Sequence, residues 1–101
     1  MENMEVIMQL IMYGGDAKSH AMEAIQLAKK GDFDEAKNAL DQANVSLIEA
    51  HHAQTSLLTK EAQGETTQLS LLMVHGQDHL MTSITFCDLA KEIVELYESR
   101  S

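Results

Sequence analysis

The sequence contains no proline and few aromatic residues, with only two tyrosines and two phenylalanines. Proline would interrupt a helix, whereas the abundant alanine, leucine, methionine, glutamate and glutamine all favour one. The composition therefore predicts an all-α protein. Its 101 residues suffice for a single domain, residues 1–101, with one modest hydrophobic core.

Basic residues are also scarce, because 7 Lys and Arg stand against 16 Asp and Glu and give a net charge of −9. This balance argues against nucleic-acid binding and suits a basic protein partner. The single cysteine, Cys87, cannot form an internal disulfide, which agrees with a reducing cytoplasm. No run of about 20 apolar residues occurs, and the acidic N-terminal segment lacks the basic region of a signal peptide. We therefore expect a cytoplasmic protein without direct membrane insertion.

Apolar residues recur at three-and-four spacing over three long stretches, which predicts three helices. The first covers residues 2–30 and ends at Gly31, because glycine readily takes the left-handed conformation that stops a helix. Asp32 is the expected N-cap of the second helix, residues 33–63, and Glu35 completes a capping box.

Gly64 is expected to end the second helix. Thr66 or Thr67 would then cap a third helix that extends to about residue 98. Because the connections are short, neighbouring helices should be antiparallel. The predicted fold is an antiparallel up-down-up three-helix bundle.

Gly14 and Gly15 interrupt the first helical pattern. The apolar spacing keeps one phase across them, so we expect a continuous helix with a close-contact notch rather than a break capped by Asp16. Two glycines cost about 1 kcal/mol each relative to alanine, which indicates a packing reason.

The third predicted helix lacks a charged outer face. Asp78 is its only charged residue between Thr66 and Cys87. Extending the charged side of its C-terminal half back by about 100° per residue reaches mostly apolar side chains. These are Met73, Val74, Met81 and Ile84, with Gln77 and Ser70 between them. The surface is either unusually apolar or a second buried face made by self-association, and we favour self-association. In such a seam Asp78 would need a cation, a hydrogen-bonding partner or an altered protonation state.

His75, Asp78 and His79 project from neighbouring turns of one side of this helix. Four interpretations are open. The histidines could be ordinary packed residues, or the three could form a two-histidine, one-carboxylate metal site. They could form a general acid/base pair, although no nucleophile motif accompanies them. Finally, one histidine could be a phosphoacceptor, because a neutral imidazole attacks a phosphoryl group directly.

The remaining candidates carry less weight. His51 and His52 are adjacent on the second helix, about 100° apart, and cannot jointly face one ligand. His20 lies near the apolar stripe of the first helix. Cys87 is interpreted as a small core residue. Gly76, directly after His75, is expected to let another backbone approach the histidine.

The segment VHGQDHLMTS (74–83) resembles the active-site segment of the lactose/cellobiose-type enzyme IIA proteins of the bacterial sugar phosphotransferase system (PTS). The family's pattern continues in the same order over nearly the whole chain. It is found in GGDAKSHAMEAI (14–25), AKKGDFDEAKNALDQAN (28–44), EAHHAQTSLL (49–58) and EAQGE (61–65). The sequence departs from it at Gly76, where alanine is usual, and at His20, where an apolar residue is usual.

The resemblance implies a homotrimer of three-helix subunits that carries phosphoryl groups. His75 would accept a phosphoryl group from the phosphocarrier protein HPr and pass it to a cysteine of the cognate IIB component. The membrane component IIC would import the β-linked disaccharide that IIB phosphorylates. His79 and Gln77 would assist at the phosphate site. Asp78 would face the threefold axis and, with its symmetry mates, bind one divalent metal ion, Mg²⁺, per trimer.

Two alternatives stand beside this interpretation. A histidine phosphotransfer domain of a two-component relay is also helical with one reactive histidine, but it usually forms a four-helix bundle. A non-catalytic helical oligomeric interaction module would use its histidines only for packing. Phosphate uptake from HPr would favour the IIA interpretation over the module.

Overall fold

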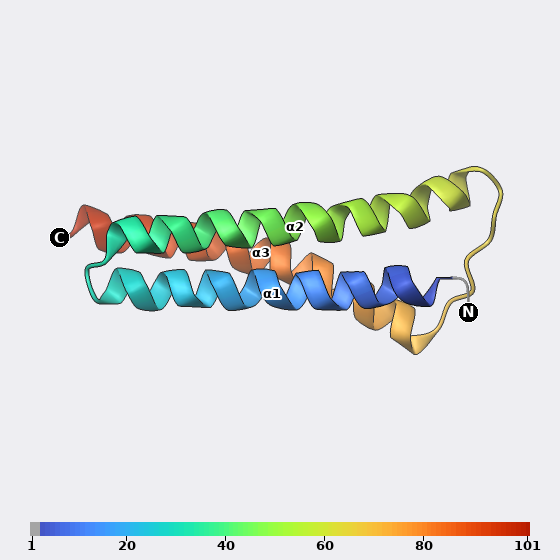
Figure 1. Cartoon of the computed structure of the whole chain (residues 1–101), viewed down its shortest axis with the longest axis horizontal. Coiled ribbons are helices and arrows are strands. Elements are labelled where there is room, and N and C mark those ends of the chain that lie inside the picture. Colours follow the sequence, from blue (N-terminus) through green and yellow to red (C-terminus); the bar gives the residue numbers. More distant parts are fainter. Residues whose placement is uncertain (1–2) are drawn as a thin grey trace.

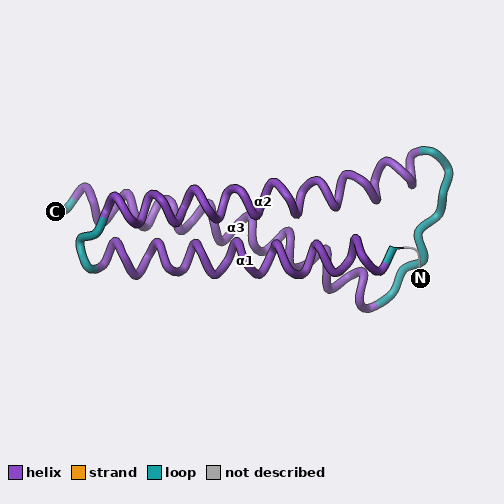
Figure 2. Tube along the Cα trace, viewed as in Figure 1, coloured by secondary structure: helices purple, strands orange, loops and turns teal. Residues whose placement is uncertain are grey.

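The computed structural model describes residues 3–101, which form three long helices joined by two connections (Figure 1). They are α1 (Met4–Lys29), α2 (Phe33–Ala62) and α3 (Leu71–Ser99). The helices lie side by side in a rod of 53 × 20 × 16 Å. Between the helices the described chain consists of loops and turns, without strands (Figure 2). The predicted all-α up-down-up bundle is confirmed, because α1 and α3 run in one direction and α2 in the other (Figure 1).

Helix α1 is the common partner in the bundle, because it packs extensively on both α2 and α3, which share a smaller interface with each other. The largest core cluster contains Ile7, Leu10, Ala50, Ala53, Leu57, Met73 and Leu80. The other two clusters are built mostly from alanines of α1 and α2 with Cys87, Ala90 and Val94 of α3. Because alanine side chains are short, α1 can approach its neighbours closely along most of its length.

The glycines end α1 and α2 as predicted. Gly31 has φ +86° and Gly64 has φ +88°, both in the left-handed region that glycine adopts at low cost. After α1, the amide of Gly31 donates to the carbonyl of Ala28 and the amide of Asp32 to that of Leu27, each at 3.0 Å. This is the pattern of a Schellman motif, which satisfies the last carbonyls of the helix.

The predicted capping box at the start of α2 is not formed. Asp32 occupies the N-cap position, but its side chain makes no capping hydrogen bond. Its backbone, at φ −86° and ψ 69°, lies outside the extended region in which a cap side chain turns back over the first turn. The box with Glu35 is therefore wrong, although the helix boundary itself is right. The predicted start of the first helix at Glu2 lies outside the described residues.

The predicted cap of the third helix at Thr66 or Thr67 is also wrong. Helix α3 begins at Leu71, after an extended connection over residues 65–70. Its N-cap is Ser70, which has φ −143° and ψ 162° and accepts a hydrogen bond from the amide of Met73 at 3.1 Å. Ser70 combines a hydroxyl with an extended backbone, so it satisfies the first turn where the two threonines do not.

No helix within residues 3–101 carries an apolar stretch long enough to span a lipid bilayer.

Candidate functional site

Helix α1 runs unbroken through Gly14 and Gly15, and Gly14 is the predicted notch. A Cβ atom at Gly14 would lie 3.1 Å from the carbonyl oxygen of His79 and 3.2 Å from its Cβ atom. At Gly15 a Cβ would meet nothing within 4 Å. The fully buried hydroxyl of Ser83 donates to the carbonyl of Gly14 at 2.7 Å, and the carbonyl of His79 lies in reach of the same hydroxyl. Gly14 therefore holds α1 against the turn of α3 that carries His79.

Gly76 is buried as well, but its neighbours are side chains. A Cβ at this position would lie 3.4 Å from the Cβ and Cδ1 atoms of Leu10 and 3.5 Å from Cγ2 of Ile7. The expectation that Gly76 admits another backbone is therefore wrong. Helix α3 continues through Gly76 without a break.

His75 and His79 lie one turn apart on α3 and contact each other. Their Nε2 atoms are 3.2 Å apart, and the rings meet edge to face with centroids separated by 4.5 Å. His75 is exposed, whereas His79 is half-buried beside α1. The structure thus brings together the two predicted histidines and leaves the ring of His75 open to a partner protein.

The buried ring of His79 favours its neutral form. Its Nδ1 atom is inaccessible to solvent and has no hydrogen-bond partner among residues 3–101. Burial lowers the pKa of His79, the charges of His75 and Lys18 lower it further, and Asp78 opposes the shift. Buried N–H groups without an acceptor are rarer than acceptors without a donor. The proton of neutral His79 is therefore favoured on Nε2, from which it is donated to Nε2 of His75.

This arrangement fixes which nitrogen of His75 carries a lone pair. If Nε2 of His75 accepts the hydrogen bond, its single in-plane lone pair points at His79, so the hydrogen bond must open before that nitrogen attacks. A lone pair on an exposed ring nitrogen is the group that attacks a phosphoryl centre. After attack, the N–H of His79 would lie beside the new phosphoryl group, where negative charge gathers.

Asp78 lies on the same side of α3 but does not join the histidines. It is exposed and lines a shallow hollow with His75, Leu71, Leu72 and Val74. Within residues 3–101 no group of three His, Cys, Asp or Glu side chains converges on a point that could hold a metal ion. A metal site made by His75, Asp78 and His79 of one subunit is therefore not formed.

The apolar outer surface predicted for α3 is present, and we call it the outer seam. It consists of Leu71, Val74, Asp78, Met81, Thr85 and Leu89, which follow one another at three-and-four spacing. Its apolar members are 54–86% exposed in the single chain. Regular spacing of this kind places all six side chains in one line along the helix, opposite the core.

Two residues predicted for this surface belong to the core instead. Met73 is only 5% exposed, and Ile84 packs against the same cluster. The extrapolation failed because the charges it started from do not lie opposite the core. Lys91 and Glu95 line a groove shared with α2, so the solvent side of the first half of α3 is rotated away from them.

Gln77 is placed away from the histidine pair. Its side-chain oxygen accepts a hydrogen bond of 2.8 Å from the amide of Gln54 on α2. Two residues along a helix correspond to about 200° of rotation, so Gln77 and His75 point to different sides of α3. The structure therefore gives Gln77 a contact between α2 and α3.

The other candidates lie apart from this site. His51 and His52 line a shallow groove with Leu47, Ile48 and Ile84.

Cys87 is buried, and its thiol donates to the carbonyl of Ala17 at 3.6 Å. Burial, with a smaller contribution from Asp88, raises the pKa of this thiol. Cys87 is therefore the unreactive core residue that the sequence predicts.

One residue near the site was missed by the sequence analysis. Lys18 of α1 lines an open groove with Ser19 and Met22 of the same helix and with Thr82 and Phe86 of α3. The sequence offers one clue to this residue: Lys18 is the only lysine or arginine before Lys29.

The fold and the site define a small helical bundle in which the accessible imidazole of His75 contacts the half-buried imidazole of His79. Residues 5–98 match the family model described as PTS system, lactose/cellobiose specific IIA subunit. The chain belongs to this family.

Individual relatives agree with the family assignment. The chain is 54% identical over 98 residues to the lichenan-specific phosphotransferase enzyme IIA component of Bacillus subtilis, covering 96% of this chain and 89% of the relative. It is 46% identical over 93 residues to the lactose-specific EIIA component of Streptococcus mutans, covering 92% and 89%.

Solved structures show the same fold. The cellobiose-specific enzyme IIA of Bacillus anthracis matches with a TM-score of 0.95 and 45% identity, over 98% of this chain and 91% of that one. The chitobiose IIA of Escherichia coli, solved in complex with HPr, matches with a TM-score of 0.84 and 43% identity, over 98% and 96%.

Proposed function

We propose that the chain is a phosphoryl carrier and that His75 is its phosphoacceptor. The observation that carries the proposal is the exposed ring of His75, whose Nε2 atom lies 3.2 Å from Nε2 of the half-buried His79. An exposed nucleophilic nitrogen with a fixed tautomer suits exchange between two proteins and needs no deep pocket. The related IIA that was solved with HPr supports HPr as the phosphoryl donor.

The transfer is a displacement at phosphorus. Once the hydrogen bond from His79 has opened, the lone pair of Nε2 of His75 forms a new N–P bond while the bond between phosphorus and the donor breaks, and that bonding pair returns to the donor atom. The Nε2–H of His79 then donates to an oxygen of the phosphoryl group. In the second step a cysteine thiolate of the IIB component attacks phosphorus, and the pair of the broken N–P bond returns to His75.

The group then passes, with the help of the membrane component IIC, to an incoming sugar. The relatives are named for lichenan, cellobiose, lactose and chitobiose, which contain β-linked sugars, and one is named for galactose. Uptake of a β-linked disaccharide is the class that these relatives support.

Self-association completes the proposal, because the outer seam would be buried between three copies of the chain. A closed ring buries one such face per subunit. Three Asp78 carboxylates would then lie near one axis and repel each other, and a divalent cation such as Mg²⁺ fits this set of oxygen ligands. The cation would neutralise the carboxylates and would take no part in the transfer.

Gln77 has a structural part in this scheme. Its hydrogen bond to Gln54 ties α2 to the turn of α3 that carries the histidines. This contact occupies its side-chain oxygen and leaves its amide N–H groups available, so Gln77 stays an auxiliary residue of the proposal beside His79.

The function is tested by incubating the protein with phosphoenolpyruvate, enzyme I and HPr and measuring its intact mass. One phosphoryl group per chain should be added, and the adduct should be acid-labile and base-stable. His75→Ala should lose the adduct while remaining helical, whereas His52→Ala, which removes an exposed histidine of α2, should keep it. An unchanged mass of the parent protein would favour the non-catalytic interaction module instead.

A further inference from the structure

A phosphoryl group on His75 would add negative charge to a protein that is already acidic. Phosphorylation adds about 1.5 to 2 negative charges at neutral pH. The chain already has a net charge of −9, and Asp78 lines the same hollow as His75. Like charges this close disfavour one another, so a nearby cation would stabilise the phosphorylated state.

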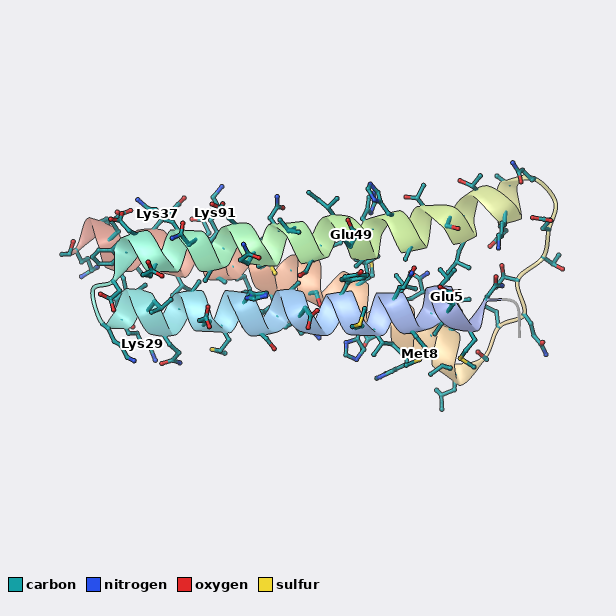
Figure 3. The ribbon with its side chains drawn as sticks, viewed as in Figure 1. Glu5, Met8, Lys29, Lys37, Glu49 and Lys91 are labelled. Carbon is teal, nitrogen blue, oxygen red and sulfur yellow. The ribbon has the colours of Figure 1, made fainter. Side chains whose placement is uncertain are left out.

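Five of the seven basic residues lie at the end of the bundle away from the histidines. Lys29, Lys37 and Lys91 are grouped near the end of the bundle that contains the turn between α1 and α2 (Figure 3). Lys30 is in that turn, and Arg100 follows the last turn of α3 at the same end. Lys60 is in the last turn of α2 at the other end, the end near which α3 begins, and α2 contributes no residue to the hollow around His75. Lys18, in the middle of α1, is the remaining cation.

The packing of α1 on α3 brings Lys18 alongside the histidine turn. Gly14, one helical turn before Lys18, is pressed against the backbone of His79. Lys18 shares its groove with Thr82 and Phe86, which follow His75 and His79 by seven residues each and therefore lie on the same side of α3. Lys18 thus lies on the side of α3 that carries the histidines, about one to two helical turns beyond the pair, and its long side chain can extend back toward them.

Lys18 is free to serve this purpose. In the part of the chain that the structure describes, the only ion pair joins Lys37 to Glu98, at 2.9 Å. The ammonium group of Lys18 thus has no carboxylate partner there. Its charge nevertheless reaches the site, because it contributes to the lowered pKa of His79, after burial and His75.

We infer that Lys18 is the cation that binds the phosphoryl oxygens on His75 and stabilises both the transfer and the phosphorylated protein. The inference rests on the proposed function, because it names a further residue of the same site. Lys18 donates hydrogen bonds from its ammonium group and keeps its proton, and it forms no bond to phosphorus. Together with the N–H of His79, it surrounds the developing charge from α1 and α3.

The test compares Lys18→Met with Lys29→Met, which removes the same charge at the remote turn. Lys18→Met should slow transfer from phospho-HPr by about 10- to 100-fold, as expected for the loss of one contact to developing charge. Lys18→Met should also raise the pKa of the phosphoryl group, because a nearby cation favours the dianion and the variant lacks that cation. Phosphorus NMR on the phosphorylated protein measures this pKa. Lys18→Arg should restore both values, and Lys29→Met should match the parent protein.

A second neutral variant, Lys18→Gln, protects the test against a packing defect at this half-buried position. If both neutral variants matched the parent in rate and in phosphoryl pKa, the inference would be overturned. A slower transfer with an unchanged phosphoryl pKa would also overturn it, because Lys18 would then act only in docking the donor. A parent protein that took up no phosphate would instead refute the proposed function, and this inference with it.

Discussion

The Nε2 atoms of His75 and His79 face each other at 3.2 Å, with the exposed ring of His75 edge-on to the half-buried ring of His79. One hydrogen lies between the two nitrogens, so one ring must donate to the other. The buried and unpartnered Nδ1 of His79 favours His79 as the donor. The reactive nitrogen of His75 is thereby fixed by a residue that does not itself react.

Replacing His79 by alanine should slow phosphoryl transfer without abolishing it. The substitution removes one donor to the phosphoryl group and the contact that orients His75, so a loss of about 10- to 100-fold is expected. Rapid-quench rates with phospho-HPr measure the effect, and His52→Ala serves as the matched control on α2. Rates equal to those of the parent would remove His79 from the site.

The folded protein should lose stability in mild acid through His79. Its pKa in the folded state is lowered from 6.5, first by burial and then by His75 and Lys18. The unfolded chain therefore takes up a proton at higher pH than the folded chain. The contribution of His79 to the free energy of unfolding is complete above about pH 6.5 and is lost as the pH falls toward the folded pKa.

Urea unfolding of the parent and of His79→Gln at pH 7.5 and 5.5 measures this contribution. The variant should show a smaller loss of stability between the two pH values than the parent. His52→Gln, which changes an exposed histidine, should lose as much as the parent. An identical loss in the parent and in His79→Gln would contradict the prediction.

The two adjacent glycines of α1 should respond in opposite ways to alanine. Gly15→Ala adds a methyl group to open space and should raise the free energy of unfolding by about 0.5–1 kcal/mol, because alanine is the better helix former. Gly14→Ala should lower it, because the added Cβ would lie 3.1 Å from a backbone oxygen of His79. Chemical denaturation measures both, and phosphoryl transfer should be slowed only in Gly14→Ala. A gain in stability at both positions would mean that the contact of Gly14 with α3 is easily relaxed.

The helices were predictable because their signals are local. Gly31 and Gly64 stop α1 and α2 through their own backbone conformation, which needs no other part of the chain. The histidine pair was predictable for the same reason, since two residues four apart on a helix must be neighbours.

Features that depend on packing between helices were not predictable. The resemblance groups Gln77 with His75 at the phosphate site, whereas its hydrogen bond to Gln54 depends on the position of α2 and has no signal in the sequence. The start of α3 was misplaced because Thr66, Thr67 and Ser70 all carry a hydroxyl that could cap a helix, and the structure shows that Ser70 is the cap. Lys18 was missed because its distance from the histidines in sequence conceals its place beside them in the groove.

The outer seam leads to the last prediction, which concerns assembly and Asp78. Light scattering should find three chains per particle, and metal analysis should find about one ion per trimer. Met81→Lys should dissociate the trimer, because it places a charge in the seam. Val45→Lys is the matched control, since Val45 is 54% exposed on α2 and Met81 is 55% exposed on α3. The control should remain trimeric.

Asp78→Asn separates the metal from the assembly. It removes the carboxylate ligand and the repulsion between the three carboxylates together, so the variant should lose the metal and remain a trimer. If the metal were the main force holding the subunits, the variant would dissociate as Met81→Lys does. A parent protein that is monomeric at micromolar concentration would contradict the trimer, and a trimer that binds metal equally well with asparagine would contradict the role of Asp78. The apolar members of the seam are more than half exposed in the single chain. Their burial is therefore expected to contribute more to the stability of the trimer than metal binding does.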